Sequence, residues 1–505
     1  MQRNKKSLFN AVSAVMLTLC NGLFGFVSVK LVLTYFGSDF NGLNSTASQF
    51  VSILMLLEGG FTVATNVALF KPYLEKDTNR VNAIISATKS TFRKIGLLSF
   101  AAGLLIAAGY SLIINTSLPK LLVFFILFMT VLPACFNFYY ATKYRILLQT
   151  EQKEYVISFI TLITTSLGYM TSIIAMPLGC SMWFVRFSTM FFSLINSFVI
   201  GFYVRRHFPH IDYNAQPDFK AIKGTRDVFA QKLTGVFYST APIVCVTLTA
   251  GGTMLASVYA VYNSVFVLLK GIMHAVIDAP RLGLGELAAQ GNKERVWKIY
   301  EQYEMIVTIM LFVFLSTAAV MIMPFIGVYT HGVTDIDYHQ PLIALMLVLI
   351  CCFELLHIPS GHLMNMTGNF RISRNIQIVA TSIMIVGFAL SLLCRWGIYG
   401  ILATVLLTAV SLCVMEVGYV HTKYFQKKLP AFFRISTPFF LLGVAITALE
   451  LRVVPPVGSY VGFFLLTVAV FAVNLVIAAA AAFLCNRDCT KRIWRFLLSF
   501  IRKNK

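Results

Sequence analysis

Five charged residues stand inside apolar stretches that are long enough to cross a membrane: Lys30, Glu58, Arg186, Lys270 and Glu354. Ionisable side chains are costly in hydrocarbon, so those that occur there usually bind an ion or a charged group, or pair with one another. Each of the five is therefore a candidate functional residue. Each also has a structural alternative, because a basic side chain can extend to the membrane surface and a carboxyl group can hydrogen-bond a neighbouring helix.

The three basic residues could bind a phosphate-bearing group. An arginine guanidinium binds phosphate through two parallel hydrogen bonds, which favours Arg186 for this role. Positive charge also offsets the desolvation free energy of an anion, which is several kcal/mol when the anion leaves water. Lys30 and Arg186 lie near the ends of their apolar stretches, whereas Lys270 lies deeper. We expect Lys270 to meet a lipid phosphate or to pair with Glu58.

The two acidic residues could couple ion movement to transport or form a gate with a basic partner. Glu354 precedes His357 by three residues, which puts both side chains on one helix face. Metal-binding helical bundles use such pairs, but they need a second Glu-x-x-His pair and two further glutamates, which we do not find. We therefore expect no metal site. Pro359 should interrupt this helix, so the stretch is expected to border a cavity.

Motifs for nucleotide-driven or hydrolytic chemistry are absent. The sequence has no G-x-x-x-x-G-K-[ST], no G-x-S-x-G and no H-E-x-x-H, and we expect no catalytic residue and no cofactor. Asp335 and Asp337 form a D-x-D that could hold a divalent metal in a membrane glycosyltransferase. The loop at 329–340 that carries them is short for a catalytic site.

The composition explains which elements must position these residues. Of the 505 residues, 58% are hydrophobic and 12% are charged, about half the charged fraction of a soluble domain. About 20 apolar residues are needed to cross a bilayer. Such stretches lie at about 10–35, 47–69, 95–114, 121–142, 155–176, 182–203, 233–249, 254–277, 305–328, 341–364, 375–394, 397–420, 436–450 and 459–484. The sequence predicts an all-α polytopic membrane protein with about fourteen transmembrane helices.

The distribution of basic residues predicts the orientation. With a cytoplasmic N-terminus, the outer connections hold only Lys120, Arg395 and Arg452 of the 41 lysines and arginines. Cytoplasmic loops are enriched in these residues. We therefore expect a multi-pass protein of the cell (cytoplasmic) membrane with both termini in the cytoplasm. The net charge of +21 reflects this topology, so no nucleic acid is expected as a partner.

The spans group into two expected lobes. Residues 1–203 form an N-lobe of spans 1–6, 204–232 a cytoplasmic linker, and 233–420 a C-lobe of spans 7–12. Spans 13 and 14 occupy 421–484, and a basic interfacial tail occupies 485–505. A faint repeat relates Ser52–Gly59, which contains Glu58, to Ser264–Gly271, which contains Lys270. This favours two six-helix lobes in a pseudo-two-fold arrangement. The segment 294–300 is expected to form a short amphipathic surface helix.

One region of the sequence resembles a known family. It runs from Gly37-Ser-Asp-Phe-Asn-Gly-Leu-Asn-Ser45 through Leu56-Leu-Glu-Gly-Gly60 to Ala68-Leu-Phe-Lys-Pro-Tyr-Leu-Glu-Lys-Asp77 and Val81-Asn82. It resembles the first three helices of bacterial O-antigen-type polysaccharide flippases, which belong to the multidrug/oligosaccharidyl-lipid/polysaccharide (MOP) exporter superfamily. Phe40-Asn41-Gly42 stands where the family usually has Tyr-Gly. The resemblance implies two lobes around a central cavity, with spans 13 and 14 at the side.

The resemblance also implies a function. Family members move undecaprenyl-pyrophosphate-linked oligosaccharide from the inner to the outer leaflet by alternating access, for export of cell-surface polysaccharide. Lys30, Arg186 and Lys270 would then face the pyrophosphate, on grounds of depth alone, and Glu58 and Glu354 would couple or gate. Expected partners are this lipid-linked oligosaccharide, membrane lipids, a polysaccharide polymerase and glycosyltransferases.

Three other functions remain open. A drug or cation antiporter and a lipid II flippase belong to the same superfamily, and the antiporter would favour an acidic cavity. A membrane glycosyltransferase or polymerase that uses Asp335 and Asp337 would belong to a different class.

Overall fold

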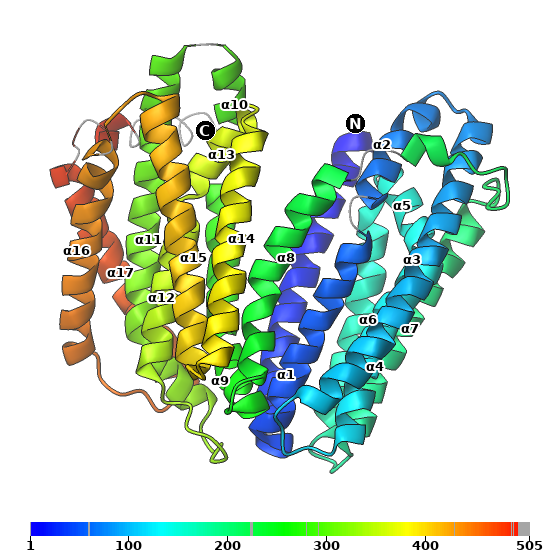
Figure 1. The fold of residues 1–505 in the computed structure, drawn as a ribbon, viewed down its shortest axis with the longest axis horizontal. Helices are drawn as coiled ribbons and strands as arrows, with labels where there is room; N and C mark the ends of the chain where they lie inside the picture. The colour runs from blue at the N-terminus through cyan, green and yellow to red at the C-terminus, as the bar shows by residue number, and fades with distance from the viewer. Residues whose placement is uncertain are drawn as a thin grey trace. The chain divides into compact units, whose positions relative to one another are not determined.

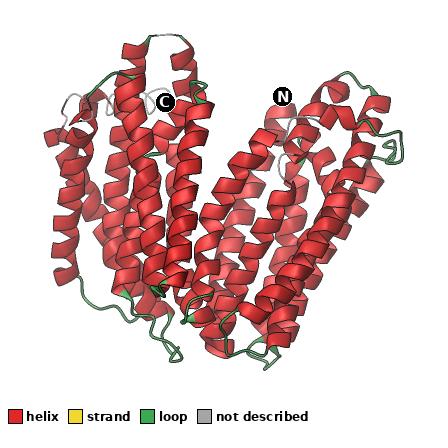
Figure 2. Ribbon diagram, in the orientation of Figure 1, coloured by secondary structure: helices red, strands yellow, loops and turns green. Residues whose placement is uncertain are grey.

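The described part of the protein consists of helices joined by short loops (Figure 2). The computed structural model describes residues 2–58, 61–222, 226–278, 280–290, 292–428, 430–485, 487 and 489–492, and these residues contain no strand. Twelve of their helices are long and apolar enough to cross a membrane. The prediction of an all-α, polytopic membrane protein is therefore confirmed.

The twelve spans correspond closely to the fourteen expected ones. The first candidate span, Val12–Glu58, covers the first expected span and the beginning of the second. The seventh expected span appears as a shorter apolar helix, Gly235–Thr247. Each of the other expected spans lies in a candidate span of its own, and the closely spaced 375–394 and 397–420 are the separate helices α14 and α15.

The chain divides into two compact units, Met1–Ser257 and Val258–Lys505. The division falls inside a helix, α9 (Gly252–Ile277), and not in the segment 204–232 that we expect to link two lobes. In this division the helix after that segment belongs to the first unit, because it packs against the first helix of the chain. Which parts of the chain move as lobes stays a prediction.

The first unit contains eight α-helices before α9 (Figure 1). They and the short 3-10 and π-helical segments between them are α1 (Gln2–Met55), η1 (Leu56–Glu58), α2 (Phe61–Leu74), α3 (Thr78–Ile113), α4 (Lys120–Phe136), η2 (Asn137–Ala141), α5 (Thr142–Thr150), α6 (Glu154–Ala175), α7 (Met182–His207), η3 (Phe219–Ile222) and α8 (Arg226–Thr247). Helix α1 packs against α4, α6 and α8, and α7 packs against α4 and α6.

The second unit is arranged around a long helix, α11 (Figure 1). Its helices after α9 are α10 (Arg281–Ala289), α11 (Lys293–Tyr329), α12 (Pro341–Leu356), α13 (Ile358–Met366), α14 (Phe370–Leu393), α15 (Gly397–Tyr419), η4 (Val420–Tyr424), α16 (Pro430–Val453) and α17 (Tyr460–Cys485). Helix α11 packs against α12, α16 and α17. The interruption expected before Pro359 is present, since α12 ends at Leu356 and α13 begins at Ile358.

The first and second expected spans are two helical segments within α1 (Gln2–Met55), and they meet at Gly37, whose backbone is not helical (φ 82°, ψ 176°). Glycine adopts this conformation readily, whereas other residues resist it. The segment 294–300 is not a separate surface helix but the beginning of α11, whose first turn is capped by the side chain of Asn292. Of the expected C-terminal tail, residues 493–505 lie outside the described residues.

The motif that carries the family resemblance holds the first unit together. The Asp39 carboxylate accepts hydrogen bonds from the Thr116 hydroxyl (2.9 Å), the Ser117 backbone N–H (2.8 Å) and the Thr253 hydroxyl. The Asn41 amide donates to the Ser257 hydroxyl (2.7 Å). The segment 39–42 of α1 thus joins the loop between α3 and α4 to the beginning of α9. Its role in this structure is to position helices.

Candidate functional site

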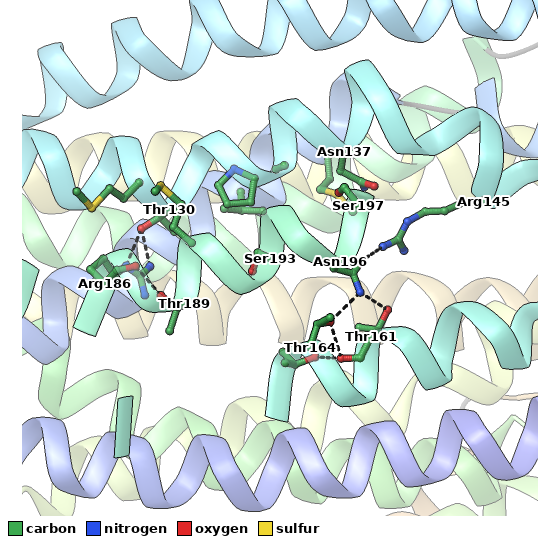
Figure 3. Close-up of a pocket in the computed structure, with 17 residues that line it drawn as sticks. Thr130, Asn137, Arg145, Thr161, Thr164, Arg186, Thr189, Ser193, Asn196 and Ser197 are labelled. Carbon is green, nitrogen blue, oxygen red and sulfur yellow. Dashed lines mark hydrogen bonds between the residues drawn. The ribbon is translucent and has the colours of Figure 1, made fainter. Parts of the chain in front are cut away.

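A cavity of about 360 Å³, with both apolar and polar side chains in its lining, lies in the first unit. It is lined mainly by α4, α6 and α7, with contributions from α1, η2 and α5 (Figure 3). Hydroxyl groups dominate its polar lining, from Thr130, Thr161, Thr164, Thr165, Thr189, Ser193 and Ser197. Two arginines, and no acidic residue, occur among the described residues that line it. The cavity therefore offers hydrogen-bond donors and positive charge inside membrane-spanning helices.

Arg186 is one of these arginines, and it was predicted from the sequence as a site residue. It lies near the beginning of α7, and its guanidinium donates to the Thr130 hydroxyl, from Nε at 3.0 Å and from Nη2 at 2.5 Å. Thr130 lies in the interior of α4 rather than at its end. The side chain is therefore turned into the cavity and does not extend along the helix to the membrane surface. One neutral hydroxyl leaves most of its five N–H donors able to bind an anion.

Arg145 is the second arginine, and sequence reasoning missed it. Its Nη2 donates to Asn196 Oδ1 at 2.7 Å, and the Asn196 amide donates to the hydroxyls of Thr161 (3.1 Å) and Thr164 (2.9 Å). The buried Arg145 Nε has no hydrogen-bond partner in the structure. Figure 3 shows Arg145 and Arg186 toward opposite ends of the labelled side chains. Each arginine could donate hydrogen bonds to a different anionic or polar group of a ligand in the cavity.

The reason for this omission is the continuation of a helix. The apolar stretch of the fourth span ends near residue 142, so Arg145 reads as part of a loop. In the structure α4 passes through the π-helical segment η2 and continues as α5 to Thr150. A π-helical turn inserts one residue and turns the following side chains to a different face. The apolar residues Ile146, Leu147 and Leu148 were the signal in the sequence that the helix continues.

The other two candidates in the first unit lie outside the lining of this cavity. Glu58 ends the short helix η1, accepts a hydrogen bond from the Thr62 hydroxyl, and interacts electrostatically with Arg145. Lys30 is half-buried in α1. A role for Glu58 as coupling or gating residue, and for Lys30 in binding substrate, stays a prediction.

Lys270 and Glu354, in the second unit, form an ion pair with each other. The Lys270 Nζ lies 2.9 Å from Glu354 Oε2, and the two side chains are 27% and 15% exposed. This contact gives Lys270 a carboxylate partner other than Glu58. Because a lysine that already faces a carboxylate attracts a phosphate less strongly, Arg186, whose partner is a neutral hydroxyl, is a better candidate for binding an anion than Lys270.

The Glu354–His357 pair expected from the sequence does not act as one unit. His357 Nδ1 lies 2.8 Å from Glu416 Oε2, while Glu354 binds Lys270. Glu416, which its position near a helix end suggested to be solvated, is 3% exposed. The end of α15 is buried because η4 extends it and α13 covers it.

Neutralising Glu354 tests the importance of its ion pair. We expect Glu354→Gln to lower the free energy of unfolding by about 1–2 kcal/mol, because it leaves the partly buried Lys270 ammonium without its counter-charge. Thermal unfolding in detergent measures the effect. The exchange Lys270→Glu/Glu354→Lys should restore part of the loss. An unchanged melting temperature for Glu354→Gln would mean that the pair contributes as little as a surface salt bridge.

A buried polar cluster surrounds the end of α15 and η4. Glu304 of α11 and His421 of η4 are 5% and 0% exposed, and His421 Nε2 lies 2.8 Å from Glu304 Oε1. The Tyr300 hydroxyl bonds to Ser360 at 2.6 Å and interacts with both Glu304 and Glu416. These residues connect α11, α13 and α15. Sequence reasoning missed the cluster because its histidine and glutamates are far apart in the chain.

The described contacts of the D-x-D loop anchor the loop itself. Asp337 is exposed, and its Oδ1 accepts a hydrogen bond from the His339 backbone N–H at 2.8 Å. The next residue, Tyr338, is anchored through its carbonyl oxygen to the Tyr262 hydroxyl at 2.7 Å. No group of three or more His, Cys, Asp or Glu side chains among the described residues could hold a metal ion.

Comparison with solved structures identifies the class of fold. A structure of the lipid II flippase MurJ in an inward closed conformation matches with a TM-score of 0.68 and 13% identity, over 94% of this chain and 99% of that one. An inward-facing multidrug resistance MATE family transporter of the MOP superfamily matches with 0.53 and 12%, over 87% and 96%. A eukaryotic MATE transporter matches with 0.52 and 13%, over 86% and 99%.

These matches make the chain a multi-pass membrane protein with the fold of MOP-superfamily transporters. No protein-family model and no curated protein matches it in sequence. At this level of identity the similarity shows the fold, and the function has to be argued from the residues of the cavity.

Proposed function

We propose that this protein is a flippase that moves a prenyl-pyrophosphate-linked oligosaccharide, in the first instance one carried by undecaprenyl pyrophosphate, from the inner to the outer leaflet. The observation that supports this most is the cavity in which Arg145 and Arg186 face hydroxyl and amide groups, with no acidic residue among the described residues of its lining. Such a site suits a group that carries both negative charge and many hydroxyls.

The chemistry of the lining explains how the head group could cross. A pyrophosphate loses its hydration when it enters the bilayer, and two guanidiniums can replace part of that hydration with charge-assisted hydrogen bonds. Hydroxyl and amide side chains such as Ser193 and Asn196 can bond to sugar hydroxyls. The apolar prenyl chain stays in the lipid hydrocarbon throughout, so it adds no desolvation cost to the movement. Alternating exposure of the site to the two leaflets would complete the movement.

The same lining argues against the antiporter alternative. A site for organic cations would be expected to carry a carboxylate, and the described residues around this cavity supply none. A lipid II flippase remains compatible, because lipid II also presents a prenyl-linked pyrophosphate, and the match to MurJ has the highest of the three TM-scores reported above. The two substrates differ in their sugars. A role beside a polysaccharide polymerase and glycosyltransferases belongs to this same proposal.

Removing either cavity arginine should slow flipping. We expect Arg186→Met and Arg145→Met each to lower the rate about 10- to 100-fold, because one charged hydrogen bond contributes about 1.5–3 kcal/mol. The assay follows protection of a fluorescent prenyl-pyrophosphate oligosaccharide from a membrane-impermeant quencher in proteoliposomes. Lys120→Gln is the matched control, since this exposed residue of α4 lies outside the cavity.

Three substrates in the same vesicles distinguish the functions. Undecaprenyl-pyrophosphate oligosaccharide and lipid II compare the two kinds of sugar, and a fluorescent organic cation tests antiport. Flipping of neither lipid together with export of the cation would overturn the proposal. Equal rates for both arginine variants and the control would show that the cavity does not bind the head group.

A further inference from the structure

Four basic side chains gather in the first unit away from the cavity: Lys89 and Arg93 of α3, Lys143 of α5, and Arg205 of α7. We call them the basic cluster. Lys89, Arg93 and Arg205 each act on the Lys143 ammonium with like charge. None of the four lines the cavity, because α5 turns Arg145 toward the cavity and Lys143 toward the cluster. The cluster is therefore a separate feature of the unit.

Lys143 is the residue that makes this grouping unusual, since it is only 9% exposed. Its Nζ lies 4.8 Å from the centre of the Tyr144 ring and 5.4 Å from that of Tyr140. The Arg205 guanidinium lies over the same two rings, at 5.6 Å from each, and donates from Nε to the Tyr144 hydroxyl at 2.8 Å. Lys143 and Arg205 therefore make cation–π contacts with the same two aromatic rings.

No carboxylate among the described residues forms an ion pair with these four side chains. Lys89 Nζ bonds instead to neutral oxygens, Asn214 Oδ1 at 2.7 Å and the Tyr213 carbonyl at 3.4 Å. The two acidic residues of that loop, Asp212 and Asp218, accept hydrogen bonds from the backbone N–H groups of Asn214 (2.8 Å) and Lys220 (3.0 Å). Like charges held together without a counter-charge destabilise a folded protein.

A buried hydroxyl points to the same place. The Tyr213 ring packs edge-on against Tyr144 with 5.4 Å between centres, and its buried hydroxyl oxygen has no hydrogen-bond partner among the described residues. Burial raises the pKa of Tyr213, so the hydroxyl keeps its proton and can donate. Buried polar atoms are nearly always satisfied, and one that is not indicates a missing partner.

The enrichment of basic residues at one membrane face does not explain these observations. That enrichment and the favourable interaction of cations with a helix C-terminus account for exposed residues such as Arg206, in the last turn of α7. They do not account for a lysine that is nine-tenths buried. A bound anion would offset the charge of Lys143 and accept a hydrogen bond from the Tyr213 hydroxyl.

We propose that the basic cluster binds a phosphate group at the membrane boundary. Lysine and arginine together bind phosphate oxygens, and a tyrosine hydroxyl can supply a further donor. The cluster includes the last turn of α7, where a span ends, so the phosphate can come from an anionic lipid head group or from solution. The site binds this anion whether or not the cavity transports a lipid-linked sugar.

Thermal unfolding of the full chain in nanodiscs tests the site. One arm titrates inorganic phosphate, against sodium chloride of equal ionic strength, in discs of phosphatidylcholine. The other arm replaces part of the phosphatidylcholine by phosphatidylglycerol. We expect the wild-type melting temperature to rise in at least one arm. A rise with phosphatidylglycerol alone would assign the site to a lipid head group, and a rise with inorganic phosphate would assign it to phosphate in solution.

Three variants make the test specific. Lys143→Met should weaken anion binding at least 10-fold and, without the anion, unfold at or above the wild-type temperature. Arg206→Gln removes one positive charge from the last turn of α7, next to Arg205 of the cluster, and should respond as the wild type does. Tyr213→Phe, which removes only one hydroxyl, should weaken binding about 3- to 10-fold. If Lys143→Met does not fold, the response of Tyr213→Phe to phosphate tests whether the basic cluster binds the anion.

Two results would overturn the proposal. One is a wild-type protein that responds to neither form of phosphate. The other is an unchanged response in Lys143→Met or, if that variant does not fold, in Tyr213→Phe.

Discussion

Gly42→Ala should destabilise the first unit by about 3 kcal/mol or more, the largest effect we expect from a single methyl group in this protein. A Cβ atom at Gly42 would lie 1.7 Å from the Thr253 carbonyl oxygen and 3.0 Å from the Ser257 backbone nitrogen. These are backbone atoms at the beginning of α9, so no side-chain rotation can relieve the overlap. The two helices would have to separate, which would break the contacts that Asp39 and Asn41 make beside them.

The measurement is the melting temperature of the purified protein in detergent, followed by size-exclusion chromatography after heating. Gly22→Ala is the matched control, because Gly22 lies in the same helix and a Cβ there would contact nothing within 4 Å. That control should be neutral or slightly stabilising, since alanine favours helix by up to about 1 kcal/mol over glycine. Equal melting temperatures for the two variants would show that α1 and α9 do not approach this closely.

Glu304→Leu should lower the free energy of unfolding by about 3 kcal/mol, the second of the two large effects that we expect. The variant removes the partner of His421, whose ring is fully buried among the rings of Trp297, Tyr300 and Phe432. His421 Nδ1 already has no hydrogen-bond partner, so the variant would leave both ring nitrogens unsatisfied. A buried polar group without a partner keeps its full desolvation cost.

A double-mutant cycle separates the pair from its surroundings. His421→Leu alone should also destabilise, because it leaves the Glu304 carboxylate facing apolar rings. The double variant Glu304→Leu/His421→Leu should be more stable than either single variant, since no uncompensated polar group remains. Thermal unfolding of the four proteins in one detergent provides the comparison. Strictly additive losses would contradict a direct interaction between Glu304 and His421.

Function and stability should separate in these experiments. Arg145 and Arg186 line the cavity without a carboxylate partner in its described lining, so their replacement removes positive charge from a polar site and should leave the fold intact. Gly42 and Glu304 hold helices together, so their replacement should lower stability first and transport only as a consequence. A variant that unfolds early and a variant that folds but does not flip are thus distinguishable.

The sequence by itself determined that this is a polytopic helical membrane protein and where most of its helices lie. A stretch of about 20 apolar residues has one favourable solvent, the bilayer, and one backbone structure that satisfies its hydrogen bonds there. Hydropathy therefore located the spans, including closely spaced pairs such as α14 and α15. It also placed Arg186 within a span, whereas the direction of its side chain came from the structure.

Only the tertiary structure decided which charges meet. Lys270 binds Glu354, His357 binds Glu416, and Arg145 enters the cavity, all of which depend on the rotation of each helix about its own axis. The kink at Gly37 and the π-helical segments η2 and η4 change that rotation, and an apolar sequence barely encodes them. The position of a charged residue along its span gives its depth in the membrane. Its partner lies on another helix, and the sequence pattern does not specify how the helices pack.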